Sequence, residues 1–234
     1  MRSQRFFNKV SSHYQDLIPK RGSTNQINFH QAIVEPRMGE RALDIGNGGV
    51  RRFYSPQTSF YVGVDFNWEM LKRGKNSNYH KVCAEAMDLP FKEGGFDTIL
   101  YFYLLHHLAQ GSIGATIEAV KKALREGSIC LKKGGNVLIA ETCVSSFLER
   151  VERASFFILR FFLFFAKQSE VFFFSADTLT RILTECGYRE VRSWKVPGGG
   201  ESPWKWVSIS ISLPHLKIPR WLNPSKIMIF EAKN

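Results

Sequence analysis

The segment RALDIGNGGV, residues 41–50, joins a short apolar strand to a turn rich in glycine. Asp44 stands near the end of the strand, and Gly46, Gly48 and Gly49 follow it. Glycine is needed where the backbone turns sharply at the carboxyl end of a strand and a ligand approaches the main chain closely. The segment therefore indicates the binding loop for a nucleoside cofactor.

This loop does not fit the dinucleotide fingerprint G-x-G-x-x-G. The fingerprint requires glycine at position 51, where this sequence has Arg51. The carboxylate of Asp44, placed before the first glycine, would repel a pyrophosphate and suits a cationic ligand. We therefore expect a positively charged nucleoside cofactor rather than a nicotinamide dinucleotide.

Short runs of Val, Ile and Leu alternate with longer amphipathic stretches along the chain. This alternation predicts β-α-β-α order and a mainly parallel sheet. The expected strands are residues 42–45, 61–64, 81–84, 98–101, 136–141, 190–195 and 226–232. Helices are expected at 114–124, before the glycines at 134–135, and after the N-cap Ser175 as far as Gly187. The expected fold class is α/β, a Rossmann-like, doubly wound, mostly parallel sheet of seven strands.

Two segments interrupt the alternation within what we expect to be a single domain, residues 1–234. Residues 1–40 are predicted to form a helical cap, with Phe6, Phe7, Val10, Tyr14 and Leu17 at helical spacing. Residues 144–175 form an insertion after the fifth strand, and its part 155–174 holds nine of the 20 phenylalanines. Arg160 interrupts the apolar run, which stays below the ~20 residues that a membrane-spanning helix needs. We expect this insertion to be a lid.

The chain has 234 residues and a formal net charge of +11, from 32 Lys and Arg against 21 Asp and Glu. Such a charge suits nucleic acid, an anionic membrane or simply a basic surface, and the basic residues form no run that would favour one of these. The four cysteines lie far apart without a C-x-x-C pair, so neither a disulfide scaffold nor a metal site is expected. No secretory signal follows the first residues, and we expect a cytoplasmic protein.

Three further motifs follow the glycine loop. Asp65 closes the second strand about 20 positions later, where an acidic residue accepts hydrogen bonds from ribose hydroxyls. Glu85 and Ala86 precede a Leu-Pro-Phe turn, and the fourth strand runs into YFYLLHHL, residues 101–108. His106 and His107 in that run are candidate general bases, because a neutral imidazole titrates in the useful range. The alternative for both histidines is a structural hydrogen-bonding role.

The order and spacing of these four blocks resemble the class I S-adenosylmethionine-dependent methyltransferases, and among them the ubiquinone/menaquinone-type group called type 11. The resemblance covers about residues 7–187. It implies S-adenosylmethionine as cofactor and S-adenosylhomocysteine as product. It further implies in-line displacement at the sulfonium methyl, in which the protein mainly aligns the reactants and excludes water.

The resemblance also implies roles for single residues. The D-x-G-x-G loop wraps the methionine end of the cofactor, the acidic residue of the second strand holds the ribose, and the next residue packs on the adenine. The Glu-Ala pair contacts the adenine amino group, and an aromatic residue after the fourth strand stabilises the sulfonium through its ring. The residues so assigned are Asp44, Gly46, Asn47, Gly48, Asp65, Phe66, Glu85, Ala86 and Tyr101. The sequence departs from the family at Val50, where a third glycine is usual, and at Glu85, where aspartate is commoner.

The acceptor is expected to be small and lipophilic or aromatic, because the phenylalanine-rich insertion lies where type 11 enzymes form their acceptor pocket. Tyr14, Phe102 and Glu141 are candidate acceptor-site residues. The alternatives are ordinary packing for Tyr14 and an edge carboxylate in water for Glu141. For the insertion itself, a plain hydrophobic lid, a homodimer surface and docking at an anionic membrane are the alternatives to an acceptor pocket.

Two other functions stay open. The charge of +11 favours an RNA methyltransferase, although the sequence has no [DNS]-P-P-[YF] motif, no Pro-Cys nucleophile and no appended binding module. A non-catalytic cofactor-binding scaffold is the third possibility. Residues 197–224, with Trp204, Trp206 and Trp221, form a long excursion that suits either a flap by the acceptor site or a variable surface loop.

Overall fold

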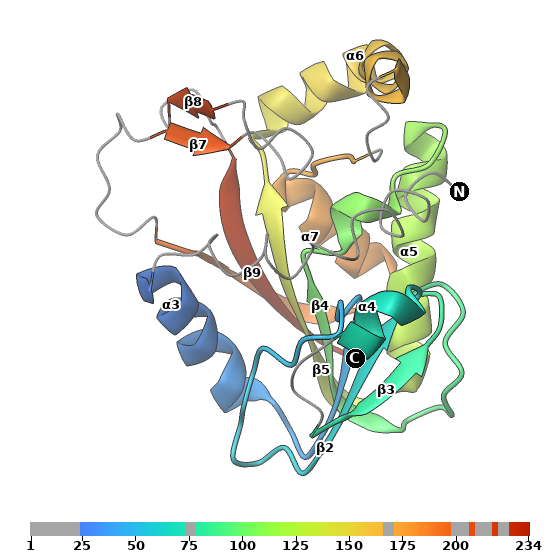
Figure 1. Ribbon diagram of the computed structural model, residues 1–234, viewed down its shortest axis with the longest axis vertical. Coiled ribbons are helices and arrows are strands. Elements are labelled where there is room, and N and C mark those ends of the chain that lie inside the picture. The colour runs from blue at the N-terminus through green and yellow to red at the C-terminus, as the bar shows by residue number, and fades with distance from the viewer. Residues whose placement is uncertain (1–23, 74–77, 166–170, 198–205, 209–216, 220–224) are drawn as a thin grey trace.

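The structure is a computed structural model, and it describes residues 24–73, 78–165, 171–197, 206–208, 217–219 and 225–234 (Figure 1). The predicted helix with Phe6, Phe7, Val10, Tyr14 and Leu17 lies outside these residues, as do Trp204 and Trp221. Within the described ranges, none of the helices combines the length and the apolar character that crossing a membrane requires.

A seven-stranded sheet forms the centre of the protein, in the order β3-β2-β1-β4-β5-β9-β6. Strand β9 runs antiparallel to its neighbours β5 and β6, and the strands from β3 to β5 pair in parallel. The strands are β1 (Arg41–Ile45), β2 (Phe60–Asp65), β3 (His80–Cys83), β4 (Phe96–Phe102), β5 (Leu131–Cys143), β6 (Arg189–Lys195) and β9 (Lys226–Lys233). The predicted fold class is therefore confirmed, and each expected strand lies within one residue or two of an observed one or inside a longer one.

The sheet is buried on both faces, which explains why its strands read as nearly continuous apolar runs. Leu43, Ile45 and Val62 face one core layer, whereas Ala42 and Tyr61 face the other. Helices α5 (Ile113–Cys130) and α7 (Ala176–Glu185) cover the first layer, and α3 (Thr24–Val34) covers the second (Figure 1).

Serine caps begin the two long helices of the first layer. The Ser112 and Ser175 side chains accept hydrogen bonds from Ala115 N and Thr178 N, so the predicted N-cap at Ser175 is confirmed. Helix α5 runs six residues past the predicted end at 124 and includes Gly127. This helical position requires glycine, because a Cβ there would collide with the Tyr101 hydroxyl. The expected turn at 134–135 is correspondingly absorbed into the start of β5.

The remaining elements lie between those named above along the chain. They are the 3-10 turns η1 (Glu35–Arg37) and η2 (Leu105–Leu108), helices α4 (Trp68–Arg73) and α6 (Ser146–Phe165), and a hairpin of β7 (Trp206–Ser208) and β8 (Lys217–Pro219).

The site is positioned by the place where the strand order reverses. The chain passes from β1 outward through β2 and β3, then returns to pair β4 with the other side of β1. Loops leaving the carboxyl ends of β1 and β4 therefore diverge and open a crevice between them, the usual ligand position in this fold.

Candidate active site

The turn after β1 can only be built with glycine. Gly46, Gly48 and Gly49 have φ angles of +75°, +63° and +80°. A Cβ on Gly46 would lie 2.8 Å from the Leu104 side chain, and one on Gly49 would collide with the Met70 carbonyl oxygen of α4. Gly49 thus supplies a left-handed residue next to Val50, which occupies the position where the family usually has its third glycine.

Asp44 lies beneath this turn and is only 2% exposed. Its Oδ2 accepts hydrogen bonds from the Tyr61 hydroxyl and from Asn47 Nδ2, both at 2.6 Å. Its Oδ1 is buried and has no hydrogen-bond partner among the described residues. Burial raises the pKa of Asp44. A buried carboxylate oxygen left in this state is costly, so a ligand that supplies a donor or a positive charge gains affinity here.

Asn47, which the resemblance assigns to the cofactor, also fixes the shape of the loop. Its Nδ2 donates to Asp44 and to the Val50 carbonyl, and its Oδ1 accepts the Tyr79 hydroxyl at 2.9 Å. No role could be predicted from the sequence for Tyr61 or Tyr79, because both reach the loop only through tertiary packing.

Asp65 ends β2 and ties the glycine turn to the start of α4. Its two oxygens accept hydrogen bonds from Gly48 N and Asn67 N, both at 2.9 Å. Burial, with smaller contributions from the charges of Asp44 and Glu85, raises the pKa of Asp65 to about 6. Each carboxylate oxygen has a second lone-pair direction, so Asp65 keeps the capacity to accept ribose hydroxyls.

The predicted adenine contacts lie at the same edge. The register between β2 and β3 pairs Asp65 with Cys83, which brings the turn at Glu85 and Ala86 close to it. Glu85 is exposed and forms a tight turn in which its carbonyl accepts from Asp88 N at 3.1 Å. Phe66 is half-buried beside Asp65. The roles of Phe66, Glu85 and Ala86 stay predictions.

The prediction that the Tyr101 ring lies beside the sulfonium is wrong. Its side chain is fully buried, and its hydroxyl donates to the Ala123 carbonyl of α5 at 2.7 Å. Alternation along β4 turns the next residue, Phe102, to the opposite layer, where its ring packs on Phe53 with centroids 4.5 Å apart. Phe102 is 5% exposed, so its ring belongs to the core of that layer.

Glu141 does not face an acceptor, and the alternative of an edge carboxylate in water is equally wrong. The residue is completely buried, with Oε2 accepting from Leu105 N at 2.9 Å and from His106 N at 3.3 Å. Its Oε1 accepts from His106 Nδ1 at 2.6 Å and from Thr142 N at 2.8 Å. Glu141 therefore holds the turn after β4 in place.

The same contacts support the structural role of His106. Its Nδ1 carries the hydrogen donated to Glu141, and its ring stacks on Phe173 at 5.3 Å between centroids. His107 packs on the His106 ring at 4.0 Å and is only partly buried. A catalytic role for His107 stays a prediction, and the candidate acceptor residue Tyr14 lies outside the described residues.

A tyrosine and a histidine that the sequence did not single out meet at this edge. Tyr103 follows β4 with φ +54° and donates its backbone N–H to the Ala140 carbonyl at 2.8 Å. Its hydroxyl lies 3.1 Å from His30 Nε2 of α3, and His30 Nδ1 lies 2.7 Å from the Gln26 carbonyl oxygen. The signal in the sequence was faint, because His30 lies 73 residues from Tyr103.

The phenylalanine-rich insertion is divided between core and surface. Phe156, Phe172 and Phe174 are buried, whereas helix α6 exposes a row of apolar side chains. That row consists of Phe147 (69% exposed), Val151, Phe157 (79% exposed), Ile158 and Phe161. Glu149 anchors the start of α6 by accepting hydrogen bonds from Ser175 N and Thr178 Oγ1, both at 2.8 Å.

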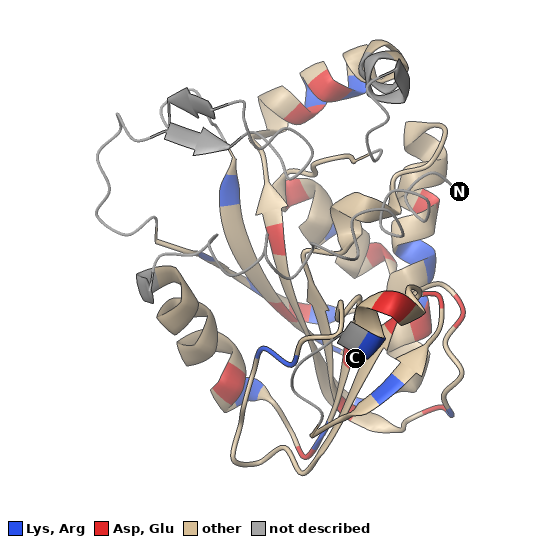
Figure 2. Cartoon of the chain, in the orientation of Figure 1, with Lys and Arg blue, Asp and Glu red and all other residues tan. Residues whose placement is uncertain are grey.

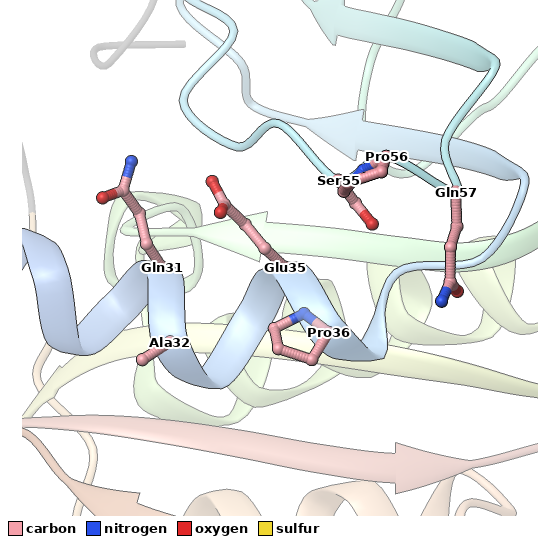
Figure 3. A pocket seen from close by; sticks show the side chains of 7 residues that line it. All are labelled: Gln31, Ala32, Glu35, Pro36, Ser55, Pro56 and Gln57. Atoms are coloured by element: carbon pink, nitrogen blue, oxygen red, sulfur yellow. The ribbon is translucent and has the colours of Figure 1, made fainter.

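A separate surface hollow of about 320 Å³ lies between α3 and the segment entering β2. Figure 3 shows the Glu35 side chain pointing from η1 toward Ser55 and Pro56 across this hollow. Glu35 precedes β1 and Pro56 precedes β2, so the hollow belongs to the amino ends of these strands and not to the crevice.

Residues 43–139 match the profile of a methyltransferase-domain family. This segment is a class I methyltransferase domain of the type 11 group. The match runs from β1 into β5, and so includes the glycine turn, Asp65, the Glu85 turn and the two histidines.

The chain is also similar in sequence to two relatives. The chain is 28% identical over 158 residues to an uncharacterised protein of Methanocaldococcus jannaschii, covering 65% of this chain and 66% of that protein. It is 28% identical over 110 residues to a demethylmenaquinone methyltransferase of Corynebacterium kroppenstedtii, covering 46% and 44%. The chain thus spans less than two thirds of the length of these relatives.

One solved structure illustrates the shared fold of the methyltransferase domain. The N-methyltransferase NodS of Bradyrhizobium japonicum, in complex with S-adenosylhomocysteine, superposes with a TM-score of 0.64. Its sequence is 12% identical, and the match covers 100% of this chain and 99% of that one.

The crevice of the methyltransferase domain fits a cationic nucleoside. Asp44 Oδ1 offers a buried oxygen among the described residues that lacks a donor, and the glycine turn leaves the main chain open to close approach. The charges of Asp44 and Glu85 both raise the pKa of Asp65, so three acidic side chains act on one another at this edge of the sheet. These residues suit S-adenosylmethionine, the cofactor of the class.

Proposed function

We propose that this protein transfers a methyl group from S-adenosylmethionine to a small, lipophilic or aromatic acceptor. One observation carries the proposal: the buried Asp44 carboxylate, open at Oδ1, lies under a glycine turn tied to Asp65. The type 11 domain over residues 43–139 supports it.

The bound cofactor supplies a methyl group already activated on sulfur. The chain supplies position and charge. Asp65 holds the ribose through its remaining lone pairs, and Asp44 favours a positive charge above the glycine turn. Leu104 and the buried ring of Phe102 close the wall from the β4 side and exclude water from the reacting centre.

The acceptor class rests on the apolar character of the insertion. Helix α6 exposes Phe147, Phe157 and Phe161. In the segment that follows this helix, Phe172 donates its backbone N–H to the His106 carbonyl at 3.1 Å. The insertion is thereby joined to the turn after β4. A relative named as a demethylmenaquinone methyltransferase adds support for a lipophilic acceptor.

Calorimetry on ligand-stripped protein tests the cofactor. We expect the protein to bind both S-adenosylmethionine and S-adenosylhomocysteine. Asp44→Asn should lower the affinity for the cationic methyl donor more than the affinity for the product, because only the donor carries the sulfonium charge. The product thus serves as the control within one variant. Absence of binding heat with either compound would refute the proposal.

Methylation of RNA is the second candidate, favoured by the net charge of +11. In the described part of the chain, Lys and Arg are distributed over many elements (Figure 2). A salt titration of RNA binding separates the two functions, because phosphate contacts give a steep loss of affinity with ionic strength. We expect the protein to bind RNA weakly, with an affinity that falls only slightly as the salt concentration rises.

A further inference from the structure

The pair of Tyr103 and His30 has a defined hydrogen-bond direction. The Gln26 carbonyl can only accept, so His30 Nδ1 carries a hydrogen and donates it over 2.7 Å. In a neutral imidazole the other nitrogen then accepts, and the Tyr103 hydroxyl donates to His30 Nε2 over 3.1 Å. Burial and the charge of Arg52 lower the pKa of His30, which keeps the ring neutral near pH 7.

This direction determines what Tyr103 offers to a ligand. Its only hydroxyl hydrogen is used on His30, so the oxygen has lone pairs left and no donor. Tyr103 is partly exposed and directly follows β4, whose carboxyl end borders the crevice. Its hydroxyl is therefore suited to receive a hydrogen bond from a molecule bound in the crevice.

A hydroxyl group on the ligand suits the Tyr103 oxygen, because it donates its hydrogen to a lone pair there and ionises to an oxyanion when the proton leaves.

We propose that Tyr103 receives the hydroxyl of an aromatic or enolic methyl acceptor, and that His30 orients Tyr103 as a hydrogen-bond acceptor. The inference rests on the proposed methyltransferase function and names its acceptor group. Tyr103 is then a catalytic residue, and His30 is a positioning residue that acts through it.

The proton path balances without a further reactant. The acceptor O–H bond breaks and its proton passes to the Tyr103 oxygen, while the proton of Tyr103 passes to His30 Nε2. The products of this step are the acceptor oxyanion, a neutral tyrosine and an imidazolium, which later returns its proton to water. The left-handed backbone at Tyr103 is held by its hydrogen bond to Ala140 and keeps the hydroxyl in this position.

A matched pair of probes tests the hydrogen bond without turnover. Fluorescence titration of protein saturated with S-adenosylhomocysteine compares 2-naphthol with its methyl ether, 2-methoxynaphthalene, which has the same rings and no donor. We expect wild-type protein to prefer 2-naphthol by about tenfold, the value of one good hydrogen bond. Equal affinity for the two probes would overturn the proposal.

Single-residue variants test whether Tyr103 and His30 cause the preference for 2-naphthol over its methyl ether. Tyr103→Phe and His30→Leu should reduce it to less than about threefold while leaving the affinity for the ether and for S-adenosylhomocysteine unchanged. His30→Gln, which offers an oxygen to the Tyr103 hydroxyl, should keep most of it, and Tyr54→Phe is the matched control at an exposed tyrosine. A full preference in Tyr103→Phe refutes the proposal. If the wild-type protein does not bind S-adenosylhomocysteine at all, the proposed methyltransferase function itself is refuted.

Discussion

The turns that follow β1 and β4 are each organised by a buried carboxylate, and the two carboxylates differ in what they leave open. Glu141 accepts four hydrogen bonds and has no exposed surface. Asp44 accepts two hydrogen bonds on one oxygen and leaves the other without a partner among the described residues. A carboxylate saturated by its own chain supports structure, whereas one left open invites a ligand.

Removing Glu141 should give the largest effect on stability. Glu141→Ala leaves the amides of Leu105, His106 and Thr142 buried without their acceptor, so we expect a loss of about 3–5 kcal/mol in the free energy of unfolding. Urea denaturation measures it. The assignment of Glu141 to structure and Asp44 to ligand binding would be wrong if the Glu141→Ala variant were as stable as the wild type and lost only acceptor binding.

Asp65→Ala should act mainly on the cofactor. It removes the acceptor expected for the ribose hydroxyls, and we expect S-adenosylhomocysteine to bind at least about tenfold more weakly, corresponding to about 1.4 kcal/mol. Calorimetry measures the affinity. Because Gly48 N and Asn67 N also lose an acceptor, Asp65→Asn is the better control for loop structure. An unchanged dissociation constant in both variants would remove Asp65 from the site.

Asp65 should also give opposite pH trends for stability and for cofactor binding. Its folded pKa of about 6 lies above the unfolded value of 3.8, so the stability that Asp65 contributes is present at low pH and is lost as the pH rises through 6. Binding of ribose hydroxyls needs the carboxylate, so affinity should fall as the pH drops below about 6. Calorimetry from about pH 5 to about pH 8, a range that spans this pKa, checks the trend. Asp65→Asn should flatten it.

Tyr101→Phe should give the smallest effect. It removes the hydrogen bond to the Ala123 carbonyl and should cost about 1 kcal/mol of stability. The affinity for S-adenosylhomocysteine should stay the same, since the ring packs toward α5. A clear loss of affinity with unchanged stability would restore Tyr101 to the cofactor site.

The sequence sufficed for the sheet, because each strand is a short apolar run and the glycine turn after β1 marks the edge where ligands bind. Asp44 and Asp65 could be placed for the same reason: they stand at strand ends, where position along the chain determines position in space. The roles of their contacts with a cofactor are still predictions.

The errors have a common physical origin in long-range packing. A strand buried on both faces gives no sign of which of two neighbours, Tyr101 or Phe102, faces which helix layer. The contact of His106 with Glu141 joins segments 35 residues apart, and that of His30 with Tyr103 joins segments 73 residues apart. Such pairs become visible only when the sheet is assembled.

Glu149 connects the start of α6 to the start of α7 through a hydrogen bond. Its carboxylate belongs to α6, yet it accepts the amide of Ser175, the residue that caps α7. Amide exchange at Ser175 therefore reports whether the first turns of α6 are docked, and both elements should open as one cooperative unit. A deuterium label on a single backbone nitrogen thus follows the attachment of the aromatic helix.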